Sequence, residues 1–278
     1  MSIFFLVFCL VLINAQVVLD KNILYFVYGY SSSSARIFLT NKNIESIHST
    51  AFSYYFDMIE LSLSYNRLAF INQTTFDGPI KLEKLFLYSN RLTQIAANVF
   101  KNLVNLKDLH LNDNQISQID IDGFNGLTRL ENLHLSANKL SSISSNMFRH
   151  LVNLKNLYLD FNFLSSTIFP AFSYLNKLQN LHLNNNKLKQ IDFNYFGEMT
   201  NLSTLNLEYN EIVKFDKNSL SGLNRLELVC LYNNPISNFM PSVLKNICEP
   251  AACHVYVVEE CSITKFQANK LNLTKRLT

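Results

Sequence analysis

Three of the six histidines are spaced by multiples of 24 residues, at His110, His134 and His182. Imidazoles at such spacing could bind a metal ion or change charge near neutral pH. A zinc site would need a further ligand, for which Asp108 or Asp160 is available. We expect no metal, because adjacent exposed histidines are usually ordinary polar surface, and we keep a pH-sensitive contact as an alternative.

Four of the five cysteines lie in the last fifth of the chain, at Cys230, Cys248, Cys253 and Cys261. An even number of clustered cysteines predicts a disulfide-tied segment in an exported protein, with three pairings open. Cys230 should point outward from a strand, so a disulfide to a second chain is the alternative. Zinc is disfavoured because the sequence has no Cys-x-x-Cys pair.

The sequence lacks the common motifs of enzyme chemistry. It has no Gly-x-Ser-x-Gly, no glycine-rich phosphate loop and no His-Glu-x-x-His, and it contains only 6 glycines. The formal net charge is +3 over 278 residues, without a dense cluster of Lys and Arg. We therefore predict a protein that is not an enzyme and that binds neither a cofactor nor nucleic acid.

A sequence repeat with a step of 24 residues sets the positions of these side chains. One copy reads Leu130-x-x-Leu133-x-Leu135-x-x-Asn138 and continues to Phe148. The asparagine recurs at Asn66, Asn90, Asn114, Asn138, Asn162, Asn186, Asn210 and Asn234. The phenylalanine recurs at Phe52, Phe76, Phe100, Phe124, Phe148, Phe172 and Phe196. A register held this long predicts a solenoid in which each unit packs on its neighbours.

Each copy predicts a short strand followed by a turn. The leucines of Leu-x-x-Leu-x-Leu point inward and the x positions point outward. The asparagine amide has donors and an acceptor, so it can satisfy turn backbone groups in its own and adjacent copies. The phenylalanines pack on the far side and widen it. The solenoid should therefore curve, with the sheet on the inside.

The segment from Met1 to Ala15 is predicted to be a secretory signal peptide. The apolar run at residues 3–13 is shorter than the roughly 20 residues that span a bilayer. It fits the roughly 7–15 residues of a signal-peptide core, and Ala15 offers a small residue before cleavage at Gln16. No other apolar run approaches membrane-spanning length. We therefore expect a secreted, extracellular protein without a membrane span.

Three further segments follow the signal peptide. Residues 16–33 are expected to form an N-terminal cap, in which residues 23–28 have the composition of a strand. Residues 34–239 hold nine repeats. Residues 240–278 form a cysteine-containing cap and tail, where helical spacing of apolar residues predicts a small helix.

Asn-x-Ser/Thr triplets at Asn72, Asn201 and Asn272 are candidate N-glycosylation sites of an exported chain. The first two fall outside the strand segments of their repeats. A glycan there would leave the strand face open.

With nine such copies, the chain resembles the leucine-rich repeat family of the extracellular 24-residue type. Relatives include Toll-like receptor ectodomains and leucine-rich immune proteins of insects. The resemblance implies an α/β fold: a curved right-handed solenoid with a parallel sheet on the concave face and irregular or short 3-10 segments on the convex face. Asn234-Pro235-Ile236 stands where the family usually has Asn-Pro-Trp, and no Cys-x-Cys follows, so the family's cap disulfides are not carried over.

Aromatic and imidazole side chains gather at outward positions of the central strands. They are Phe86, Tyr88, His110, His134, Tyr158, Phe161 and His182. Exposed rings with polar neighbours serve as anchors in protein interfaces. The alternative is that neighbouring rings stack and stabilise the sheet. We predict that this surface binds a partner.

The resemblance implies a secreted binding protein of innate immunity whose concave face recognises a protein, a glycan or a microbial ligand. A cell-adhesion or extracellular-matrix protein is the alternative. An intracellular scaffold or enzyme inhibitor would require the signal peptide to be absent. A concave-face or disulfide-linked dimer remains open.

Overall fold

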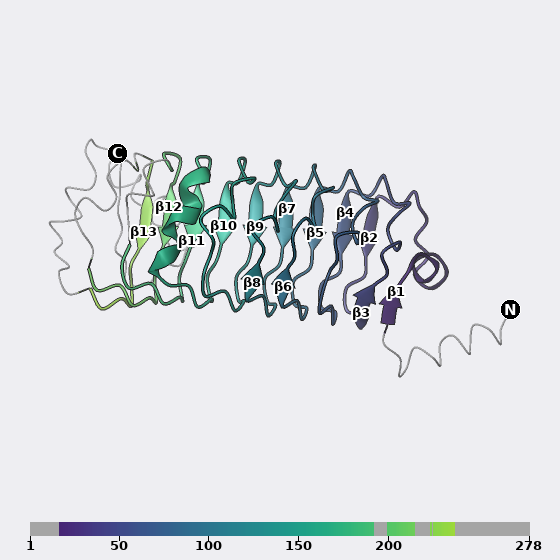
Figure 1. Cartoon of the computed structure of the whole chain (residues 1–278), viewed down its shortest axis with the longest axis horizontal. Coiled ribbons are helices and arrows are strands. Elements are labelled where there is room, and N and C mark those ends of the chain that lie inside the picture. Colours follow the sequence, from purple (N-terminus) through teal and green to yellow (C-terminus); the bar gives the residue numbers. More distant parts are fainter. Residues whose placement is uncertain (1–16, 192–198, 215–222, 224, 237–278) are drawn as a thin grey trace, which may run out of the picture.

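The computed structural model describes residues 17–191, 199–214, 223 and 225–236. These residues form a curved solenoid with one strand of the main sheet in each coil (Figure 1). The strands of this nine-stranded sheet are β2 (Arg36–Phe38), β4 (Glu60–Ser62), β5 (Lys84–Phe86), β7 (Asp108–His110), β9 (Asn132–His134), β10 (Asn156–Tyr158), β11 (Asn180–His182), β12 (Thr204–Asn206) and β13 (Leu228–Cys230).

The main sheet is parallel throughout, and its register reproduces the sequence repeat. Leu133 of β9 pairs with Leu109 on one side and Leu157 on the other, each at the same position of the neighbouring repeat. The leucines of the strands are buried, and the residues beside them face the inner side of the arc. The predicted parallel sheet is confirmed.

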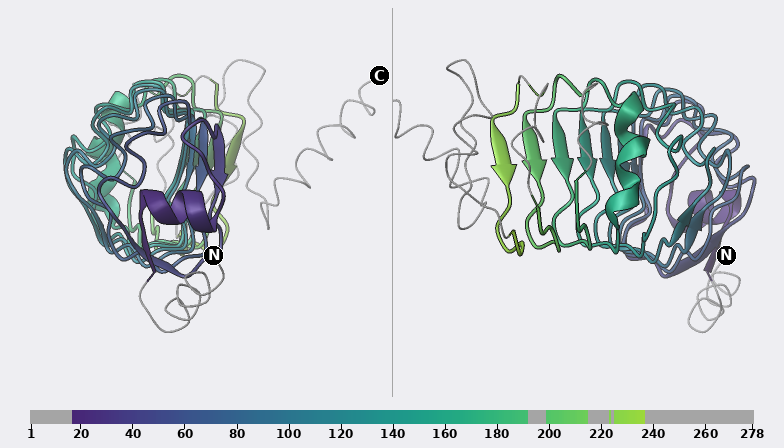
Figure 2. Two further views of the ribbon diagram at one scale, coloured as in Figure 1. Left: turned by 90° about the vertical axis from the view of Figure 1, so that its right-hand side faces the viewer. Right: turned by 60° about the vertical axis from the view of Figure 1, so that its left-hand side comes forward.

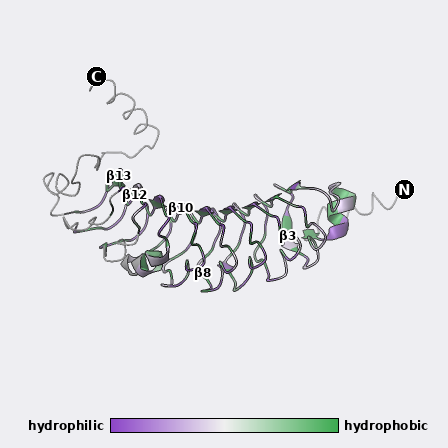
Figure 3. Ribbon diagram, turned by 90° about the horizontal axis from the view of Figure 1, so that it is seen from above, coloured by the Kyte–Doolittle hydropathy of each residue, from purple (hydrophilic) through white to green (hydrophobic). Residues whose placement is uncertain are grey.

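The width of the outer side explains the curvature seen in Figure 3. Phenylalanine rings of successive coils stack there, with centroids 6.0–6.3 Å apart in the pairs from Phe52 to Phe100 and from Phe124 to Phe172. Parallel strands are only about 4.8 Å apart. The coil is therefore wider at the phenylalanines, and the sheet lies on the inner side of the arc, as predicted. Phe196 lies outside the described residues.

The outer side carries short elements. A 3-10 helix, η2 (Ser166–Tyr174), lies opposite the main sheet (Figure 2). Two small parallel sheets pair β6 (Gln94–Ile95) with β8 (Gln118–Ile119), and β1 (Val17–Leu19) with β3 (Ile44–Ile47). This agrees with the short segments expected there.

Buried asparagines join the coils in the way the sequence predicts. The Asn138 Nδ2 donates hydrogen bonds to the carbonyls of Leu111 (2.9 Å) and Leu135 (3.1 Å). Its Oδ1 accepts the N–H of Ile116 at 2.9 Å. Bonds of the same kind recur once per repeat, from Asn66 to Asn234. Each amide thus satisfies backbone groups of two coils, and those from Asn66 to Asn210 do so while buried.

The recurring asparagines from Asn66 to Asn234 form a ladder along the solenoid. The residue before each of them has a left-handed backbone, as does Asn41 at the same position of the first repeat. The members are Asn41, Tyr65, Ser89, Asp113, Ala137, Phe161, Asn185, Tyr209 and Asn233, with φ between 52° and 57°. This conformation turns the chain off the sheet while its N–H still bonds the next coil, as from Ala137 to the carbonyl of Asp160. No member is glycine, so the sequence carried no sign of this requirement.

The strand expected at residues 23–28 is wrong, because most of this segment is the short π-helix η1 (Ile23–Val27). The Asp20 carboxylate accepts the N–H groups of Asn22 and Ile23, which starts a helical turn. The edge of β2 is covered by a side chain instead of a strand. There the Tyr30 hydroxyl bonds both the N–H and the carbonyl of Phe38.

The signal peptide and the C-terminal cap, residues 1–15 and 240–278, lie outside the described residues, so the division into segments remains a prediction. Within the described part of the chain, no helix is long and apolar enough to cross a membrane.

Candidate functional site on the inner face

Five rings form one continuous row across β5, β7, β9, β10 and β11. Their centroid separations are 4.8 Å for Phe86–His110, 4.0 Å for His110–His134, 4.3 Å for His134–Tyr158 and 4.7 Å for Tyr158–His182. The rings of the last three pairs are stacked nearly parallel, with interplanar angles of 8–16°. The row forms because the parallel register places these residues at the same pleat position.

The stacking limits what the row can bind. Each ring between the two ends has both faces covered by its neighbours, so only its rim is available to a ligand. The rims carry imidazole nitrogens and the Tyr158 hydroxyl, which can donate or accept hydrogen bonds. The rings therefore stack on one another, which was the alternative interpretation, and a partner can contact only their polar rims. His182, at one end of the row, is buried.

The environment disfavours the charged form of the histidines in the row. Burial, together with the neighbouring His110 and His182, lowers the pKa of His134 to about 4. Burial also lowers the pKa of His110 and of His182, although Asp108 and Asp160 act in the opposite direction. Neutral imidazoles stack without repulsion. The free protein therefore does not protonate His134 appreciably between pH 7.5 and 5.5, which weakens a pH-sensitive contact at that residue.

A row of amides runs beside the rings. The Asn180 Nδ2 donates to Asn156 Oδ1 (2.6 Å), and the Asn156 Nδ2 donates to Asn132 Oδ1 (2.5 Å). Asn132 in turn donates to Asp108. Each amide retains a second N–H for a ligand. Sequence reasoning missed this row, although Asn132, Asn156 and Asn180 recur with the step of the repeat.

Tyr88 and Phe161 lie outside the stack. Tyr88 contacts Phe86 edge-on at 6.4 Å, while Phe161 is 56% exposed beside the sheet. Sequence reasoning missed Phe163, which is also exposed and has the Lys187 ammonium 5.0 Å from its ring centroid. The two phenylalanines flank Asn162, so the signal was the Phe-Asn-Phe triplet. Both are exposed apolar side chains that follow β10 in the chain.

The remaining predicted residues are dispersed. Cys230 pairs in register with Asn206 and so occupies the outward column that the repeat predicted, although it is buried there. Cys248, Cys253 and Cys261 lie outside the described residues. Asn72 is exposed, and Asn201 is half-buried with its Nδ2 bonded to the carbonyl of Asn176. Asn272 lies outside the described residues, and disulfides and glycans remain predictions.

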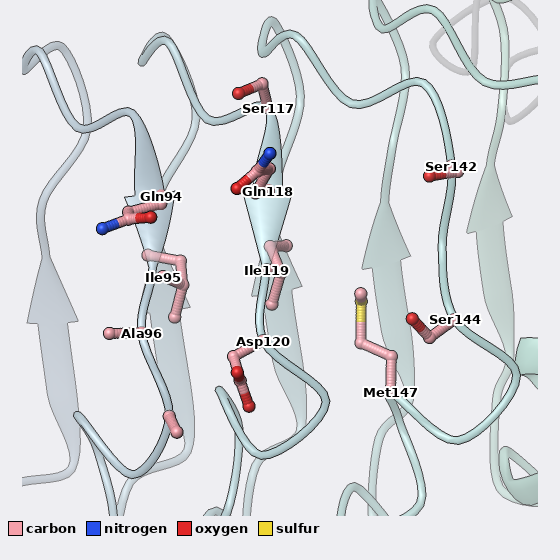
Figure 4. Close-up of a pocket in the computed structure, with 11 residues that line it drawn as sticks. Gln94, Ile95, Ala96, Ser117, Gln118, Ile119, Asp120, Ser142, Ser144 and Met147 are labelled. Atoms are coloured by element: carbon pink, nitrogen blue, oxygen red, sulfur yellow. The ribbon is translucent and has the colours of Figure 1, made fainter.

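A pocket of about 400 Å³ lies away from the inner face, between β6, β8 and residues 142–147 (Figure 4). Its lining is mostly amide, hydroxyl and apolar, and Asp120 is the single titratable side chain in it. No group of three or more potential metal ligands occurs among the described residues. The pocket therefore offers no paired groups for acid–base or metal chemistry.

The fold is that of a solenoid protein of the binding-scaffold class. Each coil matches one copy of the sequence repeat, the inner sheet is parallel, and a ladder of asparagines joins the coils. The family described as leucine rich repeat matches residues 35–92, 58–116, 80–140, 104–164 and 176–236, which is more than half of the chain. The chain belongs to the leucine-rich repeat family. No curated protein matches it.

Solved structures with the same architecture include immune receptors. A TLR13–ssRNA13 complex is similar, with 29% identity, a TM-score of 0.65 and 73% of this chain covered. The Toll–Spatzle complex, described as a molecular hub in Drosophila development and innate immunity, has 29% identity and a TM-score of 0.68 over 72% of this chain. This chain spans only 28% of the length of either receptor chain.

A bacterial protein shares the fold as well. An internalin from Listeria monocytogenes has 24% identity and a TM-score of 0.64, over 81% of this chain and 61% of the internalin. At this identity the likeness shows the fold alone.

Proposed function

We propose that this protein is an exported recognition protein of innate immunity that binds a protein or glycan partner, including a microbial ligand, through its inner face. The observation that carries the proposal is the row of rings from Phe86 to His182. Because the rings hold one another in place, a partner that contacts their rims need not order them. The similarity to Toll and TLR13 supports a role in immunity.

The chemistry of the inner face indicates the kind of contact. The amides from Asn132 to Asn180 supply hydrogen-bond donors, and the ring rims add donors and acceptors. Phe161 and Phe163 add exposed apolar area after β10. A partner with carbonyl or hydroxyl groups over the sheet and an apolar group against these side chains would match the surface. Such a surface binds and has no paired groups for catalysis.

Adhesion to cells or matrix would use the same face. Induction of the protein after microbial challenge would favour immunity, and constant expression in one tissue would favour adhesion. Nucleic acid is expected not to be a ligand of this face, although one similar structure is a complex with ssRNA.

Export can be tested by expressing the full chain in secretory eukaryotic cells. We expect protein in the medium that begins at Gln16 and loses mass when N-glycans are removed enzymatically. Intact protein retained in the cytosol with Met1 present would contradict export.

Partner binding can be tested with matched variants of the mature chain. The partner would be captured from extracellular fluid, purified and measured against each variant. Phe161→Ala combined with Tyr158→Ala should weaken binding by about 30-fold or more if these residues are central to the interface. Phe70→Ala is the control, because Phe70 is equally exposed (55%) but aligns with β6 and β8. Equal affinities for all variants would contradict the proposed face.

A further inference from the structure

Three cations form a row along the loops that lead into the main strands. They recur in every second coil, at Arg129, Lys177 and Arg225. Each is exposed, and each donates a hydrogen bond to an asparagine of the preceding coil. The bonds are Arg129 to Asn105 Oδ1 at 2.8 Å, Lys177 to Asn153 Oδ1 at 2.6 Å and Arg225 to Asn201 Oδ1 at 2.7 Å.

The three asparagines are themselves fixed to backbone. Their Nδ2 atoms donate to the carbonyls of Ile80 (2.8 Å), Thr128 (2.7 Å) and Asn176 (2.8 Å), again one coil earlier. Each cation is therefore positioned by two successive hydrogen bonds. The row is a regular feature of the solenoid edge, because the same arrangement occurs three times.

The same repeat position in earlier coils is occupied by Asp57 and Lys81, and this pair differs from the later cations in its charge. Lys81 bonds Asp57, which stands one repeat earlier, at 2.7 Å, so its charge is neutralised within the chain. At Arg129, Lys177 and Arg225 the bonding partner is a neutral asparagine amide, which does not compensate the positive charge. Among the described residues, the ion pairs include none with Arg129, Lys177 or Arg225.

The carboxylates of the neighbouring repeat position, two residues further along the chain, have partners of their own. Glu83 pairs with Lys107 at 3.0 Å, Glu131 pairs with Lys155 at 2.7 Å, and Glu227 beside Arg225 also has an interaction partner. The edge therefore keeps positive charge at regular intervals. With strands about 4.8 Å apart, successive cations of the row lie about 10 Å apart.

We infer that this edge binds a sulfated glycan chain. A row of regularly spaced cations matches a linear polymer with repeated anionic groups, and guanidinium and ammonium groups form strong hydrogen bonds to such oxyanions. The exposed residues next to the cations in the sequence include Thr128 and Asn176, because Leu130, Leu178 and Leu226 are buried. None of these residues is aromatic, whereas sites for single-stranded nucleic acid usually stack bases on rings.

The inference rests on the proposed function in one respect: the protein must be exported to encounter sulfated glycans, which lie outside the cell. The surface is separate from the row of rings. Its test uses purified protein, so export or partner binding can fail while glycan binding holds, and the reverse.

The test measures binding of the mature chain to heparin by titration at several salt concentrations. Wild type should bind at about 0.15 M salt, and affinity should fall as salt rises. Changing Arg129, Lys177 and Arg225 together to Gln should weaken binding on the order of 100-fold, at about five-fold per cation. It should also reduce the log–log salt slope by about 3.

Two further variants separate the row from general charge. Changing Asp57 to Asn and Lys81 to Gln together should leave heparin affinity unchanged, because this ion pair carries no net charge. Asn153→Asp keeps Lys177 but supplies a carboxylate where Asp57 stands in the first pair, so it should weaken binding about five-fold. Thermal unfolding would confirm that all variants fold.

Several results would overturn the inference. They are no heparin binding by wild type, equal binding by the triple Gln variant, or equal binding of desulfated heparin. Tighter binding of a single-stranded RNA of similar length, lost in the same triple variant, would assign the row to nucleic acid instead.

Discussion

Asn138→Ala should destabilise the solenoid strongly, although no ligand surface is touched. The side chain is almost fully buried and bonds four backbone groups, the N–H of Ile116 and the carbonyls of Leu111, Leu135 and Ser136. The carbonyls of Leu111 and Leu135 each keep a second bond, to Asn114 and Asn162. The Ile116 N–H has no other hydrogen-bond acceptor among the described contacts, so it would be left unsatisfied in the core.

These contacts give the magnitude. A buried backbone donor left without a partner costs about 1–3 kcal/mol, and each weakened carbonyl adds about 0.5–1 kcal/mol. We therefore expect a loss of about 3–4 kcal/mol in the free energy of unfolding. Urea titration followed by circular dichroism would measure it.

The control is Asn184→Ala, which removes a half-buried asparagine whose Nδ2 bonds only its neighbour Asn185. Its effect should stay within about 0.5 kcal/mol. A loss below about 1 kcal/mol for Asn138→Ala would refute the reasoning that the ladder amides replace water for the buried turn. Equal losses for both variants would do the same.

Two further predictions concern pH and backbone strain. Because burial lowers the folded pKa of His134 to about 4, below the unfolded value near 6.5, the unfolded chain binds more protons between these values. The contribution of His134 to the free energy of unfolding is thus complete above about pH 6.5 and falls as the pH drops towards 4. His134→Gln should remove about 1 kcal/mol of this fall, allowing for solvent screening. Plots of unfolding free energy against pH that run parallel for the variant and wild type would contradict the prediction. Ala137 has φ 53°, so Ala137→Val should cost about 1–2 kcal/mol in thermal unfolding while Ala137→Gly changes stability by less than about 0.5 kcal/mol. Equal melting of the Val variant and wild type would show that the turn relaxes.

The repeat predicted most of the fold because residues that pair in neighbouring strands are separated in the chain by one repeat of 24 residues. Leu133 can pair with Leu109 and Leu157 only if each copy of the repeat makes one full coil. The asparagine and phenylalanine columns then follow, since a buried amide needs partners and large rings need space. The N-terminal cap lacks such a repeat, and there the apolar composition of residues 23–28 misled the strand prediction.

The inner face was predictable in position and not in arrangement. The phase of the repeat placed His110, His134 and Tyr158 in one column. Whether their rings stand apart as anchors or stack depends on side-chain rotation against neighbours in the adjacent repeats, which no single copy contains. Stacking also buried the imidazoles and lowered their pKa values, so their charge was decided by the same contacts.

The amino-acid sequence by itself determined the coil, the strand register and the sign of the curvature, because these depend on which residue types recur at which step. Tertiary structure alone decided which polar groups are paired across coils and which remain open. Lys81 and Lys177 occupy one column and look alike in the sequence. Only the coil before each one, with Asp57 in one case and Asn153 in the other, determines whether the charge is neutralised or left for a partner.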